Sequence, residues 1–418
     1  MKKLTLLTVM LVQILVGQEE GTVSHEEPNV EWNGNLDAKY TVLRFAANSP
    51  IARLQFFQQS IPSTASQYRL EPYLNAAYTM SDVGFQMRLH GTYYDDRRSS
   101  MDLFEAFARY SPSIQTSFQT GKSVYTWGKG YAFNPVGFVN PAKDPENPEL
   151  AQAGLLSAHV EYVGSYTSGP VQSFSALVVV VPPGPSLNDR FGDLGNTDVA
   201  VKLSALMWDT DFDVMTYQSA NAPDRYGIDL SANILENLEV HGEASLARRA
   251  SRSVVINGVA KQEPTDALNV LTGIRFLSST NTTVIVEYYR NGTGMNEPEF
   301  KSYRSFLLAA ADAGTPAAVQ HALQTNQSFF HTSTLMRDYV YVKALHPEPF
   351  DWLYVTPSVF ALVNVNDGSL LVAAPVSYKP ATNSEFIFWP TLLLGSETSE
   401  FGSRQARQRF ELWMRVFF

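Results

Sequence analysis

The strongest constraint on this chain is an alternation of apolar and polar residues with a period of two. From residue 30 to residue 42 the apolar set is Val30, Trp32, Leu36, Ala38, Tyr40 and Val42, and the polar set is Glu31, Asn33, Asn35, Asp37, Lys39 and Thr41. Successive side chains of a β-strand point to opposite faces of a sheet. Charged groups are costly to bury in an apolar core, so the polar face must meet water. About 9 to 11 such residues, tilted at about 45°, cross a bilayer as a barrel strand.

The same alternation recurs at 83–94, 225–234 and 238–246. Short turn signals join neighbouring segments, among them Ser81-Asp82, Glu236-Asn237 and His346-Pro347. The other connections are longer and are expected at 46–68, 127–154, 250–266 and 291–330. Short turns at one rim and long loops at the other are typical of outer-membrane barrels, with the short turns in the periplasm.

The fold class expected is therefore all-β, a transmembrane antiparallel β-barrel of about 18 strands, with 16 strands as the alternative. An even count returns both ends of the barrel, 30–418, to the periplasmic rim. The expected strands begin near Val30, Arg69, Val83, Met101, Ser113, Leu155, Val171, Thr197, Asp211, Asp224, Leu238, Ala267, Thr282, His331, Trp352, Ser369, Glu385 and Gln405.

The last expected strand carries a second signal. Its outward positions are Phe410, Leu412, Met414, Val416 and Phe418. Alternate apolar residues that end on an aromatic residue resemble the signal that outer-membrane barrels present to their insertion machinery, which is therefore an expected partner together with outer-membrane lipid.

Aromatic residues near the expected strand ends fit interface girdles, because amphipathic rings are stable at headgroup depth. The candidates are Trp32, Tyr93, Tyr110, Tyr162, Trp208, Tyr217, Tyr288, Trp352, Tyr354 and Trp389. Ordinary core packing is the alternative reading.

The first residues predict export. Met1-Lys2-Lys3 is followed by the apolar run 4–16 and by Gly17, so 1–17 reads as a signal peptide and 18–29 as a periplasmic tail. Loss of Lys2 and Lys3 would change the formal net charge from -10 to -12, which argues against nucleic acid as a partner. Cysteine is absent, so disulfides and thiolate metal sites are excluded.

The inward faces carry charges of both signs, which a hydrated lumen can hold. The candidate pore-lining residues are Arg88, Arg109, Arg225, Asp229, Glu239, His241, Glu243, Arg275, Glu287, Arg409, Glu411 and Arg415. Each is either a wall charge in an ion-pair network or a direct contact for a solute. The list does not indicate an ion selectivity.

The segment 127–154 is rich in Asx-Pro steps, which disfavour helix and predict an ordered, turn-rich loop. It either folds into the pore and constricts it or forms a rigid surface loop. In the first case the residues expected at the constriction are Trp127, Lys129, Lys143, Asp144 and Glu146.

One stretch resembles a known group of barrels. The sequence FEAFARY at 104–110, followed by Gly121-Lys122, Trp127-Gly128 and Asn-Pro steps, resembles the strand pair and loop of porin-like families that include alginate-export-type barrels. The resemblance covers about 50 residues and is carried in kind by Gly121, Trp127, Gly128 and Asn134. It implies a barrel channel, and no substrate-binding residue carries over.

The segment 291–330 predicts a helical hairpin. Asn296 is a candidate N-cap before Pro298, Gly314 a candidate terminator, and Thr315-Pro316 the start of a second helix. The hairpin could be a packing element, an extracellular lid, a plug or a knob that binds a partner.

An enzyme is not expected, and no cofactor or metal is expected. The seven histidines show no HExxH or paired metal-ligand spacing. His241 lies between Glu239 and Glu243, where an acid-base site is conceivable, but a solvated wall histidine is the simpler reading.

The function expected from these features is passive diffusion of small hydrophilic solutes through a porin-like channel in the outer membrane of a Gram-negative bacterium, because barrels of 16 to 18 strands enclose an aqueous channel. The alternatives are a sheath around a protein partner such as a multihaem cytochrome, a specific exporter or uptake channel, and a barrel enzyme. Assembly into homo-oligomers stays open.

Overall fold

The chain folds into one antiparallel sheet that closes on itself. The computed structural model describes residues 29–184, 188, 195–330 and 332–418. The expected signal peptide, 1–17, and all but the last residue of the tail, 18–29, lie outside the described residues.

The strands have the following bounds: β1 (Asn29–Phe45), β2 (Thr64–Met80), β3 (Val83–Tyr94), β4 (Ser99–Ser113), β5 (Thr116–Ser123), β6 (Leu155–Ser165), β7 (Val171–Val181), β8 (Asp198–Met207), β9 (Thr210–Gln218), β10 (Asp224–Leu235), β11 (Leu238–Ile256), β12 (Val259–Leu277), β13 (Thr283–Arg290), β14 (Asp338–Leu345), β15 (Val355–Asn364), β16 (Leu370–Ala373), β17 (Val376–Ala381), β18 (Ser384–Leu394) and β19 (Ala406–Phe417).

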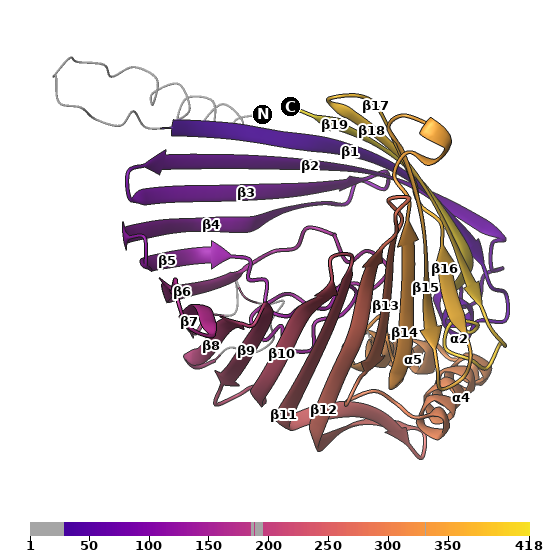
Figure 1. Cartoon of the computed structure of the whole chain (residues 1–418). Helices are drawn as coiled ribbons and strands as arrows, with labels where there is room; N and C mark the ends of the chain where they lie inside the picture. Colours follow the sequence, from indigo (N-terminus) through magenta and orange to yellow (C-terminus); the bar gives the residue numbers. More distant parts are fainter. Residues whose placement is uncertain (1–28, 185–187, 189–194, 331) are drawn as a thin grey trace, which may run out of the picture.

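Apart from β16 and β17, each strand pairs with its sequence neighbours, and β1 pairs with both β2 and β19, which closes the barrel (Figure 1). The strands β16 and β17 both pair with β15 and β18, so they share one position that is interrupted at Ala374-Pro375. Proline lacks the N–H that a ladder needs. The 19 strands therefore fill 18 positions, and the expected count of 18 is confirmed.

The two ends of the barrel differ. Short turns join β2 to β3, β8 to β9, β10 to β11 and β17 to β18 at the end where β1 begins, here called the turn rim. The opposite end, the loop rim, carries most of the longer connections and the α-helices, whereas the 3-10 turn η2 (Pro349–Asp351) lies at the turn rim (Figure 1).

The backbones of β1 and of the last residue of the chain are in close contact where the barrel closes. Gly34 and Phe418 exchange two backbone hydrogen bonds of 2.9 and 3.0 Å. A Cβ on Gly34 would lie 2.2 Å from the carbonyl oxygen of Tyr73 and 2.7 Å from the Phe418 ring, so only glycine fits. Phe410, Leu412, Met414 and Phe418 are exposed on the outer face and Val416 is half-exposed.

The outer face of the barrel is an apolar belt. Alternate residues such as Ile228, Leu230 and Val214 are exposed to the outside. Most of the expected girdle aromatics are exposed as well: Trp32, Tyr93, Tyr110, Tyr162, Trp208, Trp352 and Tyr354. The girdle expectation is wrong for Tyr217, which is buried, and for Trp389, which points inward and packs 5.3 Å from the Trp413 ring.

Several strand boundaries differ from expectation. The expected loop at 250–266 is wrong, because β11 and β12 continue as a long hairpin with Asn257-Gly258 at its tip. Asn-Gly is a strong signal for a two-residue hairpin turn. The strand expected from His331 begins at Asp338, after the helical insertion, and the strand expected from Trp352 begins at Val355.

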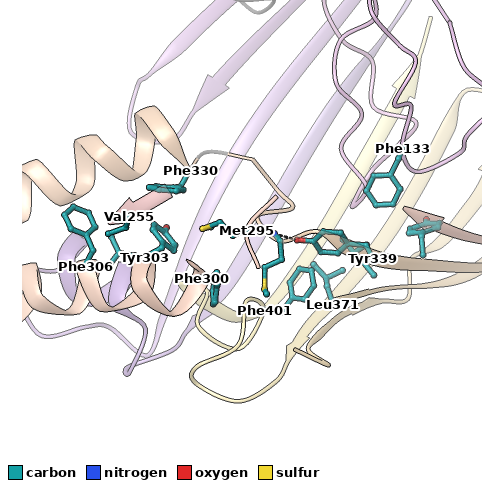
Figure 2. Close-up of a cluster of buried hydrophobic side chains, with 14 of the residues drawn as sticks. Phe133, Val255, Met295, Phe300, Tyr303, Phe306, Phe330, Tyr339, Leu371 and Phe401 are labelled. Atoms are coloured by element: carbon teal, nitrogen blue, oxygen red, sulfur yellow. Dashed lines mark hydrogen bonds between the residues drawn. The ribbon is translucent and has the colours of Figure 1, made fainter. Parts of the chain in front are cut away.

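Three helices cover part of the loop rim. The helices α4 (Glu297–Ala313) and α5 (Pro316–Phe329) confirm the expected hairpin, since Asn296 caps α4 and Gly314 ends it in the left-handed region. The short helix α2 (Pro50–Gln55) was not expected. Figure 2 shows Phe300, Tyr303 and Phe306 of α4 in a buried cluster that continues to Phe401 and Tyr339. In the part of the chain that the structure describes, no helix is long and apolar enough to cross a membrane.

Buried ion pairs link β1 to both of its neighbours, β19 and β2. Arg415 donates two hydrogen bonds, of 2.7 and 2.8 Å, to the carboxylate of Asp37. Lys39 donates a 2.5 Å bond to Glu71 and lies over the Trp413 ring at 4.0 Å. Because Asp37 is completely buried, its two bonds from Arg415 replace water that it cannot reach.

Substitution of Asp37→Ala should destabilise the barrel, since it leaves Lys39 and Arg415 without this partner. We expect the free energy of unfolding to fall by about 1 to 3 kcal/mol, at the low end for buried pairs because Arg415 is partly exposed. The measurement is the temperature at which the folded band disappears on a semi-native gel. Asp96→Ala, which removes an exposed pair with Arg98, is the control and should leave that temperature unchanged. Equal temperatures for both variants would contradict the role of Asp37.

Candidate pore and its inward loop

The connection between β5 and β6, residues 124–154, runs through the interior of the barrel (Figure 1). We call it the inward loop. It starts beside Glu105 on β4, which accepts a 3.2 Å hydrogen bond from the Val124 N–H. From there it reaches inward-facing side chains of β11, β13, β14 and β19. It therefore bridges opposite walls.

The first half of the loop packs on an apolar patch of the inner wall. Tyr125, Trp127, Val136, Phe138 and Val139 form one buried cluster with residues of the neighbouring wall: Leu155, Val179, Val181, Ala200, Met215 and Tyr217. The Asn140 side chain closes this half by bonding both the N–H and the carbonyl of Trp127, at 3.0 and 2.8 Å. Trp127, expected at a constriction, is thus buried against the wall.

A buried carboxylate on β11 holds the middle of the loop. Glu243 accepts hydrogen bonds from the backbone N–H groups of Lys129 (2.6 Å), Gly130 (2.6 Å) and Val136 (3.3 Å). The backbone comes this close because Gly128 adopts a φ of +95° and has no Cβ, which would lie 2.8 Å from a Glu243 oxygen. Bonds to an ionised acceptor are among the stronger hydrogen bonds.

A second buried carboxylate, on β13, holds the next two residues. Glu287 accepts from the N–H of Tyr131 and, at 2.9 Å, from the N–H of Ala132. His241 approaches the same Glu287 carboxylate at 3.0 Å. The expected wall residues Glu243, Glu287 and His241 therefore meet around the loop, and the first two bind its backbone directly.

The second half of the loop is held by ion pairs. Glu146 contacts Arg404 at 3.1 Å and Arg409 of β19 at 2.9 Å. Glu149 accepts a 2.6 Å hydrogen bond from the Tyr131 hydroxyl and lies 3.3 Å from Lys343 of β14. These contacts fix the loop against the wall opposite its origin.

The other charged loop residues are partly buried. Lys129 lies 3.3 Å from Asp213 on β9. Lys143 donates to the carbonyls of Gly130 (2.5 Å) and Tyr131 (3.1 Å), and burial lowers its pKa from the ordinary value. Burial, with the neighbouring charge of Glu146, raises the pKa of Asp144.

The inward loop lies between two cavities. The turn-rim cavity, of about 490 Å³, is lined by wall residues that include Arg88, Arg415 and Lys343 and by loop residues 146–151. The loop-rim cavity, of about 580 Å³, is lined by loop residues 133–145 and by wall residues that include Arg225 and Asn291. No described residue lines both cavities.

In two arginine ion pairs of the wall, the cation is more exposed than the carboxylate. The side chain of Arg88 is 33% exposed, whereas that of its partner Glu105, at 3.2 Å, is 8% exposed. The corresponding values are 27% for Arg415 and 0% for Asp37. At these two pairs, the guanidinium group is therefore more accessible to water than its carboxylate.

The remaining expected wall residues have local partners or none. Arg109 donates to Gln119 at 2.9 and 3.1 Å. Glu411 pairs with Arg409 at 2.7 Å, and Glu239 accepts from Ser231 at 3.2 Å.

Two further residues expected in the pore wall are Asp229 and Arg275. Asp229 is buried beside Asp213 in the pairing of β10 with β9. Arg275 is exposed and forms no salt bridge among the described residues.

Residues that sequence reasoning missed lie in the same networks. Asp37, Lys39, Glu71 and Glu385 form the seam cluster with Arg415, and Glu149 and Lys343 anchor the loop. For Asp37 and Lys39 on β1, the alternation predicted that the side chains point inward. It did not predict which residues of other strands contact them.

Within the described residues, no group of three or more histidine, aspartate or glutamate side chains is arranged to hold a metal ion. His241 sits beside Glu287 and 3.6 Å from Glu239 but is almost completely buried. A solute in either cavity does not reach it, since it lines neither.

Comparisons with known proteins identify the fold. No protein-family model and no curated protein sequence matches the chain. Among solved structures, Pseudomonas aeruginosa OccK2 (OpdF), crystallised in complex with glucuronate, has a TM-score of 0.55 at 7% identity, over 93% of this chain and 98% of that one. Pseudomonas aeruginosa OccK11 (OpdR) has a TM-score of 0.52 at 10% identity, over 93% and 96%.

A BenF-like porin from Pseudomonas fluorescens Pf-5 is similar too, with a TM-score of 0.52 at 11% identity, over 93% of this chain and 98% of that one. At these identities the likeness establishes a porin-like barrel fold alone. The narrower resemblance to alginate-export-type barrels gains no support from these comparisons.

Substitution of Glu243→Ala should loosen the inward loop, because it removes the acceptor of three backbone N–H groups. We expect amide hydrogen exchange in peptides covering 129–136 to accelerate by about one to two orders of magnitude, as each lost bond to a charged group is worth about 1.5 to 3 kcal/mol. Exchange is measured by mass spectrometry on the folded barrel. Glu239→Ala, on the same face of β11 but without a loop contact in the structure, is the control. Unchanged exchange in Glu243→Ala would show that the carboxylate does not hold the loop.

Proposed function

We propose that this protein is a porin-like channel in the outer membrane of a Gram-negative bacterium that lets small hydrophilic solutes diffuse passively, with the inward loop as its constriction. The observation that carries the proposal is a loop that bridges a closed barrel and leaves a polar cavity on each side. A barrel of this strand number encloses enough space for an aqueous path. No chemical step is assigned to it.

The direction of insertion follows from the unequal rims. We place the turn rim in the periplasm and the loop rim, with α2, α4 and α5, outside the cell, as is usual for outer-membrane barrels. The apolar belt then faces lipid, and the exposed last strand is available to the insertion machinery during assembly. The described porin-like neighbours, including one that is solved with a bound sugar acid, are consistent with solute passage.

A sheath around a protein partner is the less favoured reading. A sheath needs a wide, unobstructed lumen, and here the inward loop fills the middle of the barrel through bonds to Glu243 and Glu287. A specific uptake or export channel is a narrower form of the proposal.

The test is single-channel recording of the purified barrel in planar bilayers. The intact chain should give discrete steps, and a variant in which residues 133–145 are replaced by a short Gly-Ser linker should give steps several times larger. Removal of the β11–β12 hairpin tip, residues 252–263, is the control and should leave the conductance near that of the intact chain. Silence from a folded, inserted barrel would refute the channel, and equal conductance in the loop variant would refute the constriction.

A further inference from the structure

The loop-rim cavity has an unusual charge composition. Its described lining contains two cationic side chains, Arg225 and Lys143, and neither aspartate nor glutamate. The turn-rim cavity, by contrast, mixes four lysines and arginines with three glutamates, namely Lys39, Arg88, Lys343, Arg415, Glu146, Glu149 and Glu385. Within the described lining, the positive charge of the loop-rim cavity is therefore not offset by a carboxylate.

Arg225 presents a guanidinium that is not engaged by a salt bridge. It lies over the ring of Tyr217, 5.6 Å from the ring centre. Asp198, on β8, is buried and accepts a 2.5 Å hydrogen bond from the hydroxyl of this tyrosine. Within the described residues, Arg225 has no carboxylate within 4.0 Å. Its fork of N–H donors is available to a ligand.

Lys143 adds a second positive charge to the same cavity from the inward loop. Its ammonium uses two donors on the carbonyls of Gly130 and Tyr131, which leaves one N–H. The acids behind it, Glu243 and Glu287, are buried and bind the loop backbone instead.

The rest of the lining combines apolar residues, such as Phe133, Phe138 and Leu155, with neutral polar groups. Ser333 and Thr334 contribute hydroxyls that form no hydrogen bond to another described residue, and Asn134 and Asn291 contribute amides. Such groups can bond hydroxyls of a ligand, while two cations fix its charged end.

We propose that the loop-rim cavity is a capture site for small hydroxylated carboxylates, with the solute carboxylate on Arg225 and Lys143. The guanidinium fork matches a carboxylate in shape and charge, and a concave wall of one sign concentrates ions of the opposite sign. The inference rests on the proposed channel function and names the solutes that it favours.

The test compares three solutes of similar size in single-channel recordings: gluconate, glucose and glucosamine, which are anionic, neutral and cationic. Gluconate added on the loop-rim side should interrupt the chloride current at concentrations at which the other two do not. Arg225→Gln should weaken this gluconate effect about tenfold and shift the reversal potential in a KCl gradient toward less anion selectivity. Arg225→Lys, which keeps the charge, should retain part of the gluconate effect and part of the anion selectivity.

Arg249→Gln is the matched control. Arg249 is exposed at the same rim and pairs with half-buried Asp224 at 2.8 Å, but does not line the cavity. If Arg225→Gln conducts but binds gluconate as tightly as the intact channel, the capture site is refuted, while the proposed channel function is not. Equal weakening by Arg225→Gln and Arg249→Gln would overturn it too, since the effect would then be general surface charge. An inserted intact barrel without any current would refute the channel itself.

Discussion

The structure depends on the closure of one hydrogen-bonded sheet. In the apolar interior of a membrane, each backbone N–H and carbonyl must find a partner inside the protein, and a sheet achieves this only when its first and last strands pair. Here β1 and β19 pair along their length, and Gly34 admits Phe418 at the end of the ladder. The ion pair of Asp37 with Arg415 and the contact of Lys39 with the Trp413 ring reinforce this junction from the lumen side. Closure gives the sheet an inner and an outer face. Since successive side chains of a strand point to opposite faces, the sequence alternates between apolar and polar residues.

The inward loop is the second consequence of closure. A loop inside the barrel must satisfy its own backbone groups away from bulk water. Glu243 and Glu287 do this from two strands of the opposite wall, and Asn140 does it from within the loop. Burial of the loop also explains the strand β7, where both faces of the run 177–181 are apolar. One face meets the outside, and the other lies under Trp127, Phe138 and their neighbours.

How much the sequence could predict varied with the range of the interaction. Local patterns sufficed for the strand number, for the helices capped by Asn296 and Gly314, and for the inward phase of Glu243 and Glu287. They did not show that these two carboxylates bind backbone N–H groups 113 and 155 residues away. The alternation also misassigned Tyr217 and Trp389 to the girdles, because an aromatic ring fits lipid and a covered inner wall equally well. The alternation did not predict the hairpin turn at Asn257-Gly258, although Asn-Gly is a strong local signal for such a turn.

The central claim is that lipid meets one set of side chains and lumen water meets their neighbours. The chain has no native cysteine, so single cysteines can be placed along β10 and spin-labelled in liposomes. The account predicts that labels at 226, 228 and 230 are relaxed by oxygen dissolved in lipid. It predicts that labels at 225, 229 and 231 are relaxed by a water-soluble nickel chelate, or are shielded from both the oxygen and the chelate. Uniform access of the nickel chelate at all six positions would contradict a membrane-spanning barrel.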